Sequence, residues 1–139
     1  MTRLVIPRAV LDEMTAHARA ALPAEGCGFL AGVVESGVGR VTHFLPLVNE
    51  LASPTAFATE ARSTFAAFKA MRAAGTDVLA IYHSHPTSAP IPSRHDLAQN
   101  IYGPSVAWVI VGLAGEEPEV RAWWLGETWV QEAEWAVDG

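Results

Sequence analysis

An apolar, strand-forming run that ends in a pair of histidines constrains this chain more than any other feature. The run Val78–His83 predicts a buried strand, and Ser84 and His85 follow it directly. Side chains two apart on a strand point to the same face, so His83 and His85 can present two imidazoles to one point. A single histidine at a strand end is usually an ordinary polar residue. A pair on one face favours a metal site.

A carboxylate follows the two histidines after a loop rich in proline and serine. It belongs to Ser93-x-x-Asp96, a pattern that is also typical of a helix start, where the serine caps the helix and the acid completes a capping box. Both roles are compatible, because a helix start holds a carboxylate rigidly. Two neutral imidazoles and one carboxylate suit Zn²⁺, with a fourth position open to water. The predicted ligands are His83, His85 and Asp96.

Glu25 is the candidate acid–base group. It lies between a helix stop at Pro23 and an apolar strand at Gly28–Val34, among glycines 26, 28 and 32, which permit close backbone approach. Alone, such an acid is usually a solvated loop residue. Beside zinc it gains a role, because the ion lowers the pKa of a bound water to about 7. A nearby carboxylate can then take the proton and pass it to a leaving amine.

The remaining sequence predicts a mixed α/β (α+β) fold in the order β-α-β-β-α-β-α-β-β-β, with helices packed on a mixed sheet. Apolar spacing and turn residues place the elements. The expected strands are Leu4–Ile6, Gly28–Val34, Arg40–Val48, Val78–His83, Val106–Val111, Glu119–Leu125 and Thr128–Trp135. The expected helices run from Pro7 to Pro23, over Arg62–Ala74, and from Ser93 to Gly103-Pro104.

Three finer expectations concern which side chains face inward. The second helix should have Phe65, Phe68, Met71 and Ala74 on one side, and Gly75 should end it. The third, short helix should bury Leu97 and Ile101. The last two strands should be joined by a type II′ turn at Gly126-Glu127, because a glycine stands first.

Composition excludes several classes of protein. The 139 residues are 50% hydrophobic and 17% charged, so we expect one compact domain over residues 1–139. The net charge is −6 and the nine basic residues are scattered, which argues against a nucleic-acid partner. No apolar run approaches the ~20 residues that span a bilayer. A single cysteine, Cys27, excludes an internal disulfide, and no signal peptide opens the chain. We therefore expect a cytoplasmic protein with no membrane partner.

Taken together, these residues resemble a known motif. His83-x-His85 followed by Ser93-x-x-Asp96, with an upstream Glu25, is similar to the JAMM motif of the MPN+ zinc metalloproteases. The flanking sequence resembles the small bacterial Mov34/MPN/PAD-1-like branch, and the resemblance covers roughly residues 3 to 130. The flanking matches are Pro23-x-Glu25-x-Cys27-Gly28, His83-Ser84-His85-Pro86, and Asn49 with Ser53-Pro54-x-x-Phe57.

The resemblance implies an MPN-type mixed sheet flanked by helices, with a cytidine-deaminase-like architecture. It implies that His83, His85 and Asp96 ligate zinc, that Glu25 is general base and then acid, and that the hydroxyl of Ser93 helps to hold a tetrahedral oxyanion.

The resemblance also implies a reaction. It is hydrolysis of an amide or isopeptide bond at or near the C-terminus of a ubiquitin-like or sulfur-carrier protein, after a C-terminal Gly-Gly. The Asn49–Phe57 loop and residues 86–92 would border the groove for that tail. Two alternatives stay open: a non-catalytic MPN scaffold or binding module, and a peptidase acting on small peptides. The oligomeric state, including a homodimer, is also open.

Overall fold

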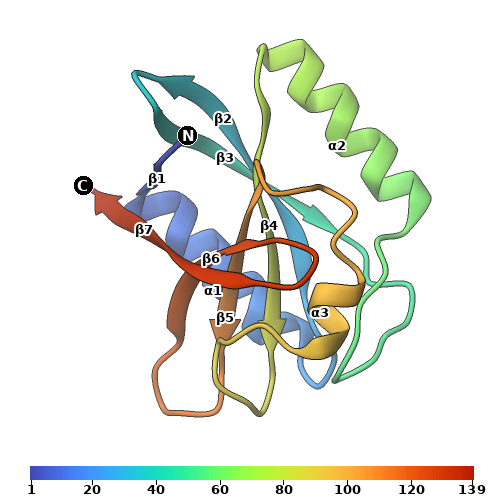
Figure 1. Ribbon diagram of the computed structural model, residues 1–139. Coiled ribbons are helices and arrows are strands. Elements are labelled where there is room, and N and C mark those ends of the chain that lie inside the picture. Colours follow the sequence, from blue (N-terminus) through green and yellow to red (C-terminus); the bar gives the residue numbers. More distant parts are fainter.

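The computed structural model describes residues 1–139 and contains every predicted strand and helix (Figure 1). The mixed α/β prediction is confirmed. The elements are β1 (Arg3–Pro7), α1 (Arg8–Ala21), β2 (Cys27–Glu35), β3 (Val38–Leu47), α2 (Ala61–Ala74), β4 (Asp77–His85), α3 (Arg94–Ala98), β5 (Ala107–Gly112), β6 (Glu119–Leu125) and β7 (Val130–Asp138).

The strands form one closed barrel in the order β1-β3-β2-β4-β5-β6-β7. The short strand β1 closes it, because β1 pairs in parallel with both β3 and β7. Strand β4 lies between an antiparallel neighbour, β2, and a parallel neighbour, β5. Because the barrel is closed, β4 is paired along both of its edges, and it lies deep in the fold.

Alternating side chains divide the core into two clusters. Helix α1 contributes to one cluster together with Ala80 and Tyr82 of β4. Helix α2 contributes to the other together with Ile81 of β4 and Trp108 of β5. The two helices therefore cover opposite faces of the strands (Figure 1). His83 and His85 follow Ile81 on the α2 side, and Ser84 follows Tyr82 on the α1 side.

The rotation of α2 differs from the prediction. Ala67 and Met71 are its buried residues, whereas Phe65 is 72% exposed and Phe68 is 48% exposed. Alanines on several sides of the helix make more than one apolar face possible, and packing against the sheet selects the row through Ala67 and Met71. The predicted end is confirmed, because Gly75 has a φ of 69°, in the left-handed region where glycine is favoured.

Two other details were wrong. Helix α3 ends at Ala98, and Ile101 lies beyond it with 83% exposure, although Leu97 does pack against the core. The last hairpin has a four-residue loop, in which the Gly126 N–H donates to the Trp129 carbonyl at 2.9 Å. A Cβ at Gly126 would meet the Trp129 indole, so a larger residue there would have to displace that ring. None of the three helices combines the length and apolar character that crossing a membrane requires.

Candidate metal centre

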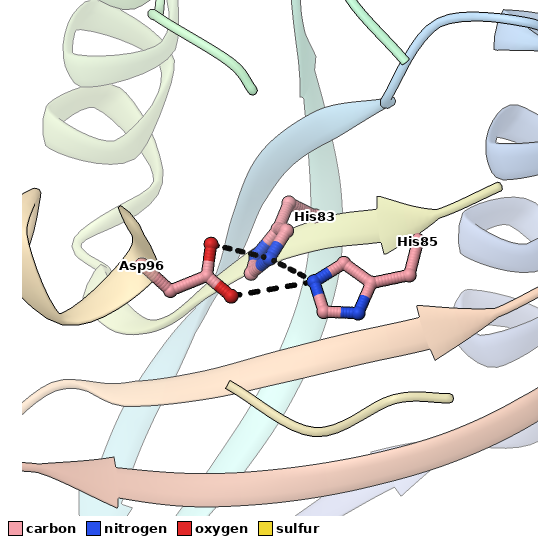
Figure 2. A group of neighbouring side chains, drawn as sticks. All are labelled: His83, His85 and Asp96. Carbon is pink, nitrogen blue, oxygen red and sulfur yellow. Dashed lines mark hydrogen bonds and ion pairs between the residues drawn. The ribbon is translucent and has the colours of Figure 1, made fainter. Parts of the chain in front are cut away.

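The structure brings the three predicted ligands together at the end of β4 (Figure 2). One ligand atom from each of His83, His85 and Asp96 lies within 4.8 Å of the others, and all three residues are buried. The two Nε2 atoms are 3.1 Å apart. His83 Nε2 is 3.1 Å from Asp96 Oδ1, and His85 Nε2 is 3.3 Å from Asp96 Oδ2. We refer to these residues as the ligand cluster.

Local sequence explains how the cluster forms. Alternation along β4 puts both imidazoles on one face, as predicted. Helix α3 begins with a full capping box: Ser93 Oγ accepts from the Asp96 N–H at 3.1 Å, and Asp96 Oδ2 accepts from the Ser93 N–H at 2.8 Å. The capping box thus fixes the carboxylate that faces the histidines.

A backbone carbonyl fixes the tautomer of His85. Its Nδ1–H donates to the Ala89 carbonyl at 2.8 Å, which leaves Nε2 to face the cluster. Such outer contacts orient imidazole ligands in metal sites. His83 is held by packing instead: the Phe57 ring stacks on it at 4.9 Å between centroids, and Trp108 meets it edge-on at 5.6 Å.

The electrostatics of the cluster suit a cation. Burial lowers the pKa of His83, which is therefore neutral and able to act as a ligand. Burial alone would raise the pKa of Asp96, but hydrogen bonds from both imidazoles hold it well below its usual range. Burial likewise opposes protonation of His85, but Asp96 and the Ala89 carbonyl raise its pKa. A buried carboxylate thus draws positive charge to this point, and two nitrogens and one oxygen are a donor set that fits Zn²⁺.

Glu25 precedes β2 by two residues and lies close enough to the cluster to interact with the charges of His85 and Asp96. Cys27 pairs with His83, and the Ser84 N–H donates to the Gly26 carbonyl at 3.0 Å. Continuing that antiparallel register sets Glu25 opposite His85, on the same face. Glu25 is only 4% exposed, and its Oε1 has no hydrogen-bond partner. Burial raises its pKa from 4.5 to about 7; the Asp96 charge adds to this and His85 opposes it.

Ser93 lies near the cluster and is the N-cap residue of α3. Its hydroxyl oxygen accepts the Asp96 N–H, so the hydroxyl proton stays available to a further acceptor. Of the other histidines, His95 is exposed, and His17 contacts Tyr82 instead of the cluster. Cys27 is buried, as expected, and burial raises its pKa to about 12.

Sequence reasoning named Phe57 as part of the loop expected to border the groove, but it missed the packing of Phe57 and Trp108 on His83 and the adjoining cavity. Phe57 and Trp108 contact His83, and both also line a cavity of about 370 Å³. The rest of its lining comes from both sides of the cluster: Ala58, Thr59, Ile81, Ala98, Gln99, Ile101 and Tyr102. Phe57 stands in a loop with no periodic pattern, so its place after Ser53-Pro54 was the signal that marked it.

Comparison with known proteins assigns the family. Residues 7–126 match the model of prokaryotic homologues of the JAB domain. The chain belongs to this prokaryotic JAB family. A relative from Thermus thermophilus, named a probable TtuB-protein conjugate cleaving protease, is 38% identical over 125 residues, which cover 89% of this chain and 77% of that protein. A desampylase from Haloferax volcanii is 37% identical over 100 residues, covering 68% of this chain and 70% of that protein.

Further JAB-family likenesses agree with this assignment. A CysO-cysteine peptidase from Mycobacterium tuberculosis is 36% identical over 94 residues, covering 68% of this chain and 63% of that protein. The solution structure of a Desulfitobacterium hafniense protein matches with a TM-score of 0.88 and 32% identity, over 97% of this chain and 92% of that one. The resemblance to JAMM metalloproteases and the prediction of a hydrolase are confirmed, and the JAB family is metal-dependent.

Proposed function

We propose that this JAB protein is a zinc-dependent isopeptidase that hydrolyses an amide bond at or near the C-terminus of a ubiquitin-like or sulfur-carrier protein. The observation that carries the proposal is the meeting of a three-residue ligand cluster with a buried, unpartnered carboxylate, Glu25. The relatives' names support the substrate class, since they refer to cleavage of TtuB conjugates, to desampylation and to a CysO-cysteine bond.

His83, His85 and Asp96 would hold the zinc. When bound, the ion would lower the pKa of a coordinated water and polarise the scissile carbonyl. Glu25 would accept the water proton and deliver it to the leaving amine. In the metal-free protein burial raises the pKa of Glu25 to about 7. The free hydroxyl proton of Ser93 would hydrogen-bond the oxygen that gains negative charge. Burial of the four ionisable groups makes these interactions stronger than in water.

Substrate access is supported by the cavity beside the cluster. Phe57 both stacks on His83 and lines the cavity, whose remaining lining is mostly apolar. An extended C-terminal tail could place one side chain there while its carbonyl reaches the cluster. We also propose that residues 1–139 act as a single MPN (JAMM) domain, because the barrel uses strands from both ends of the chain. The cytidine-deaminase-like architecture stays a prediction.

Two measurements test the proposal. Protein purified without chelator should contain about one zinc per chain, as a three-ligand site predicts. It should also cleave a ubiquitin-like or sulfur-carrier protein that is extended by a short peptide beyond its Gly-Gly. Glu25→Gln should keep the zinc and lose the activity, whereas Asp96→Asn should lose both.

The controls separate the alternatives. A peptide that carries the same Gly-Gly junction without the folded carrier should be cleaved poorly; equal cleavage of both would favour a small-peptide peptidase. Zinc-loaded protein that cleaves neither substrate would favour the scaffold alternative.

A further inference from the structure

We propose that Asn49 is a positioning residue that aims Glu25 at the ligand cluster, an inference that rests on the proposed function. Asn49 follows β3 and begins the loop that leads to Phe57. Its side-chain amide makes four hydrogen bonds to backbone groups. Nδ2 donates to the carbonyls of Glu25 at 3.0 Å and Ala56 at 3.1 Å, and Oδ1 accepts from the N–H groups of Leu51 and Ala58, both at 3.1 Å.

These four bonds use the full capacity of the amide, which has two N–H donors and two oxygen lone pairs. They also fix its orientation, because the two carbonyls can only accept and the two backbone N–H groups can only donate. Aspartate has the same shape but lacks the donors. Glutamine has the donors but adds a methylene. Asparagine is thus the residue type that this position requires.

Hydrogen bonds hold the backbone N–H and carbonyl groups of both Glu25 and Gly26. The Glu25 N–H donates to the Ser53 carbonyl at 2.8 Å, and the Glu25 carbonyl accepts from Asn49. Gly26 then exchanges two hydrogen bonds with Ser84: its N–H donates to Ser84 Oγ at 2.8 Å, and its carbonyl accepts from the Ser84 N–H. By contrast, Glu25 Oε1 has no partner. The direction of the carboxylate therefore depends on its backbone, which Asn49 helps to fix.

Two of the other bonds of Asn49 reach the residues on either side of Phe57. Ala56 and Ala58 flank Phe57, whose ring stacks on His83 with an interplanar angle of 24°. The Asn49 amide thus connects the peptide of Glu25, the proposed base, to the loop that holds the Phe57 ring against His83. A general base acts only within hydrogen-bond reach, and a shift of about 1 Å can cost on the order of 100-fold in rate.

Asn49→Asp is the decisive variant, since it keeps the two acceptor contacts and loses both donors. We expect kcat to fall by roughly 30- to 100-fold, with KM and zinc content nearly unchanged. In a Glu25→Gln background the same substitution should lower the residual rate less than about threefold, because the base is already absent. Gln131→Glu is the matched control, because it makes the same amide-to-carboxylate change at an exposed position on β7. We expect its kcat to stay within about twofold of wild type.

Amide hydrogen exchange on the metal-free protein gives a readout that does not depend on activity. The Gly26 N–H belongs to the same peptide group as the Glu25 carbonyl that Asn49 holds. We expect the Gly26 amide to exchange at least about tenfold faster in Asn49→Asp and at the wild-type rate in Gln131→Glu. If Asn49→Asp fails to fold, Asn49→Ser serves instead, because its hydroxyl can still accept from the Leu51 N–H.

Three results would overturn the inference: an equal rate loss in the Glu25→Gln background, a loss of zinc in parallel with activity, or unchanged exchange at the Gly26 amide. Failure of the proposed function looks different. Wild-type protein would then bind no zinc and cleave nothing, and hydrogen exchange would still test the contact between Asn49 and Glu25.

Discussion

Replacing Glu25 by glutamine should stabilise the metal-free protein at neutral pH while abolishing its activity. Glutamine keeps the shape of the side chain and removes its charge. In the folded protein burial raises the pKa of Glu25 from 4.5 to about 7. The folded state therefore binds the proton more tightly than the unfolded state. The stability linked to this proton is fully present below pH 4.5 and is lost as the pH rises through about 7.

The magnitude follows from the size of the shift. One pKa unit corresponds to ~1.4 kcal/mol, so a shift from 4.5 to about 7 amounts to about 3 kcal/mol above pH 7. That is a large part of the 5–15 kcal/mol that typically separates folded from unfolded domains. Glutamine cannot ionise, so the variant does not lose this stability as the pH rises.

Urea denaturation of chelator-treated protein measures the effect. The free energy of unfolding of Glu25→Gln minus that of wild type should rise by about 3 kcal/mol between pH 4.5 and pH 8. His85 and Asp96 titrate in both proteins, so the subtraction removes their common contribution. Glu13→Gln is the control, because Glu13 is an exposed acid on α1, and its difference should stay flat.

A pH-independent difference for Glu25→Gln would refute the reasoning, because it would mean that the Glu25 carboxylate ionises as freely in the folded protein as in water. Zinc provides a second check. A bound cation favours the ionised form of a neighbouring carboxylate, so saturating zinc should shrink the difference.

The other predictions concern the ligand cluster and its supports. Removal of metal by a chelator should abolish amide hydrolysis, and one equivalent of zinc should restore it in a continuous cleavage assay. Asp96→Asn should weaken zinc binding by more than the roughly 10- to 100-fold that loss of an outer contact costs, as measured by competition with a chromophoric chelator. Ser93→Ala should destabilise the protein by about 1 kcal/mol through loss of the cap and lower kcat by about 10²- to 10³-fold through loss of an oxyanion donor. Ser93→Thr should retain the cap and much of the activity. Phe57→Ala should reduce kcat and zinc affinity together, because His83 loses its stacked neighbour.

Features that depend on neighbouring residues could be predicted from the sequence. The convergence of His83 and His85 needs only the alternation of a strand, and the rigid placement of Asp96 needs only the capping box that Ser93 begins. The strands and helices themselves follow from apolar spacing and from glycine and proline at their ends. Each of these signals lies within about ten residues of chain.

Features that depend on distant partners could not be predicted. Closure of the barrel requires β1 to pair with β7, at the other end of the chain. Packing against the sheet selects which face of α2 is buried. In the four-residue loop that begins at Gly126, the Trp129 indole packs against the glycine. The sequence marked Asn49 as part of the loop expected to border the groove, but not its contact with Glu25, because that contact joins segments 24 residues apart.

The distribution of buried polar residues argues against a purely structural role for this site. The chain buries five polar or charged side chains: Glu25, His83, Ser84, His85 and Asp96. All five lie where the end of β4 meets the start of β2 and the cap of α3, and the rest of the buried side chains are apolar. Burying ionisable groups costs free energy, and apolar residues of similar volume are often as stable or more so. A scaffold would gain stability from such replacements. A metal-dependent hydrolase instead needs two neutral imidazoles, a ligand carboxylate and a proton-transferring carboxylate together in one buried site.

The same reasoning predicts that zinc raises the midpoint of thermal unfolding for wild type and leaves that of Asp96→Asn unchanged, because only an intact cluster can bind the ion more tightly in the folded state than in the unfolded one.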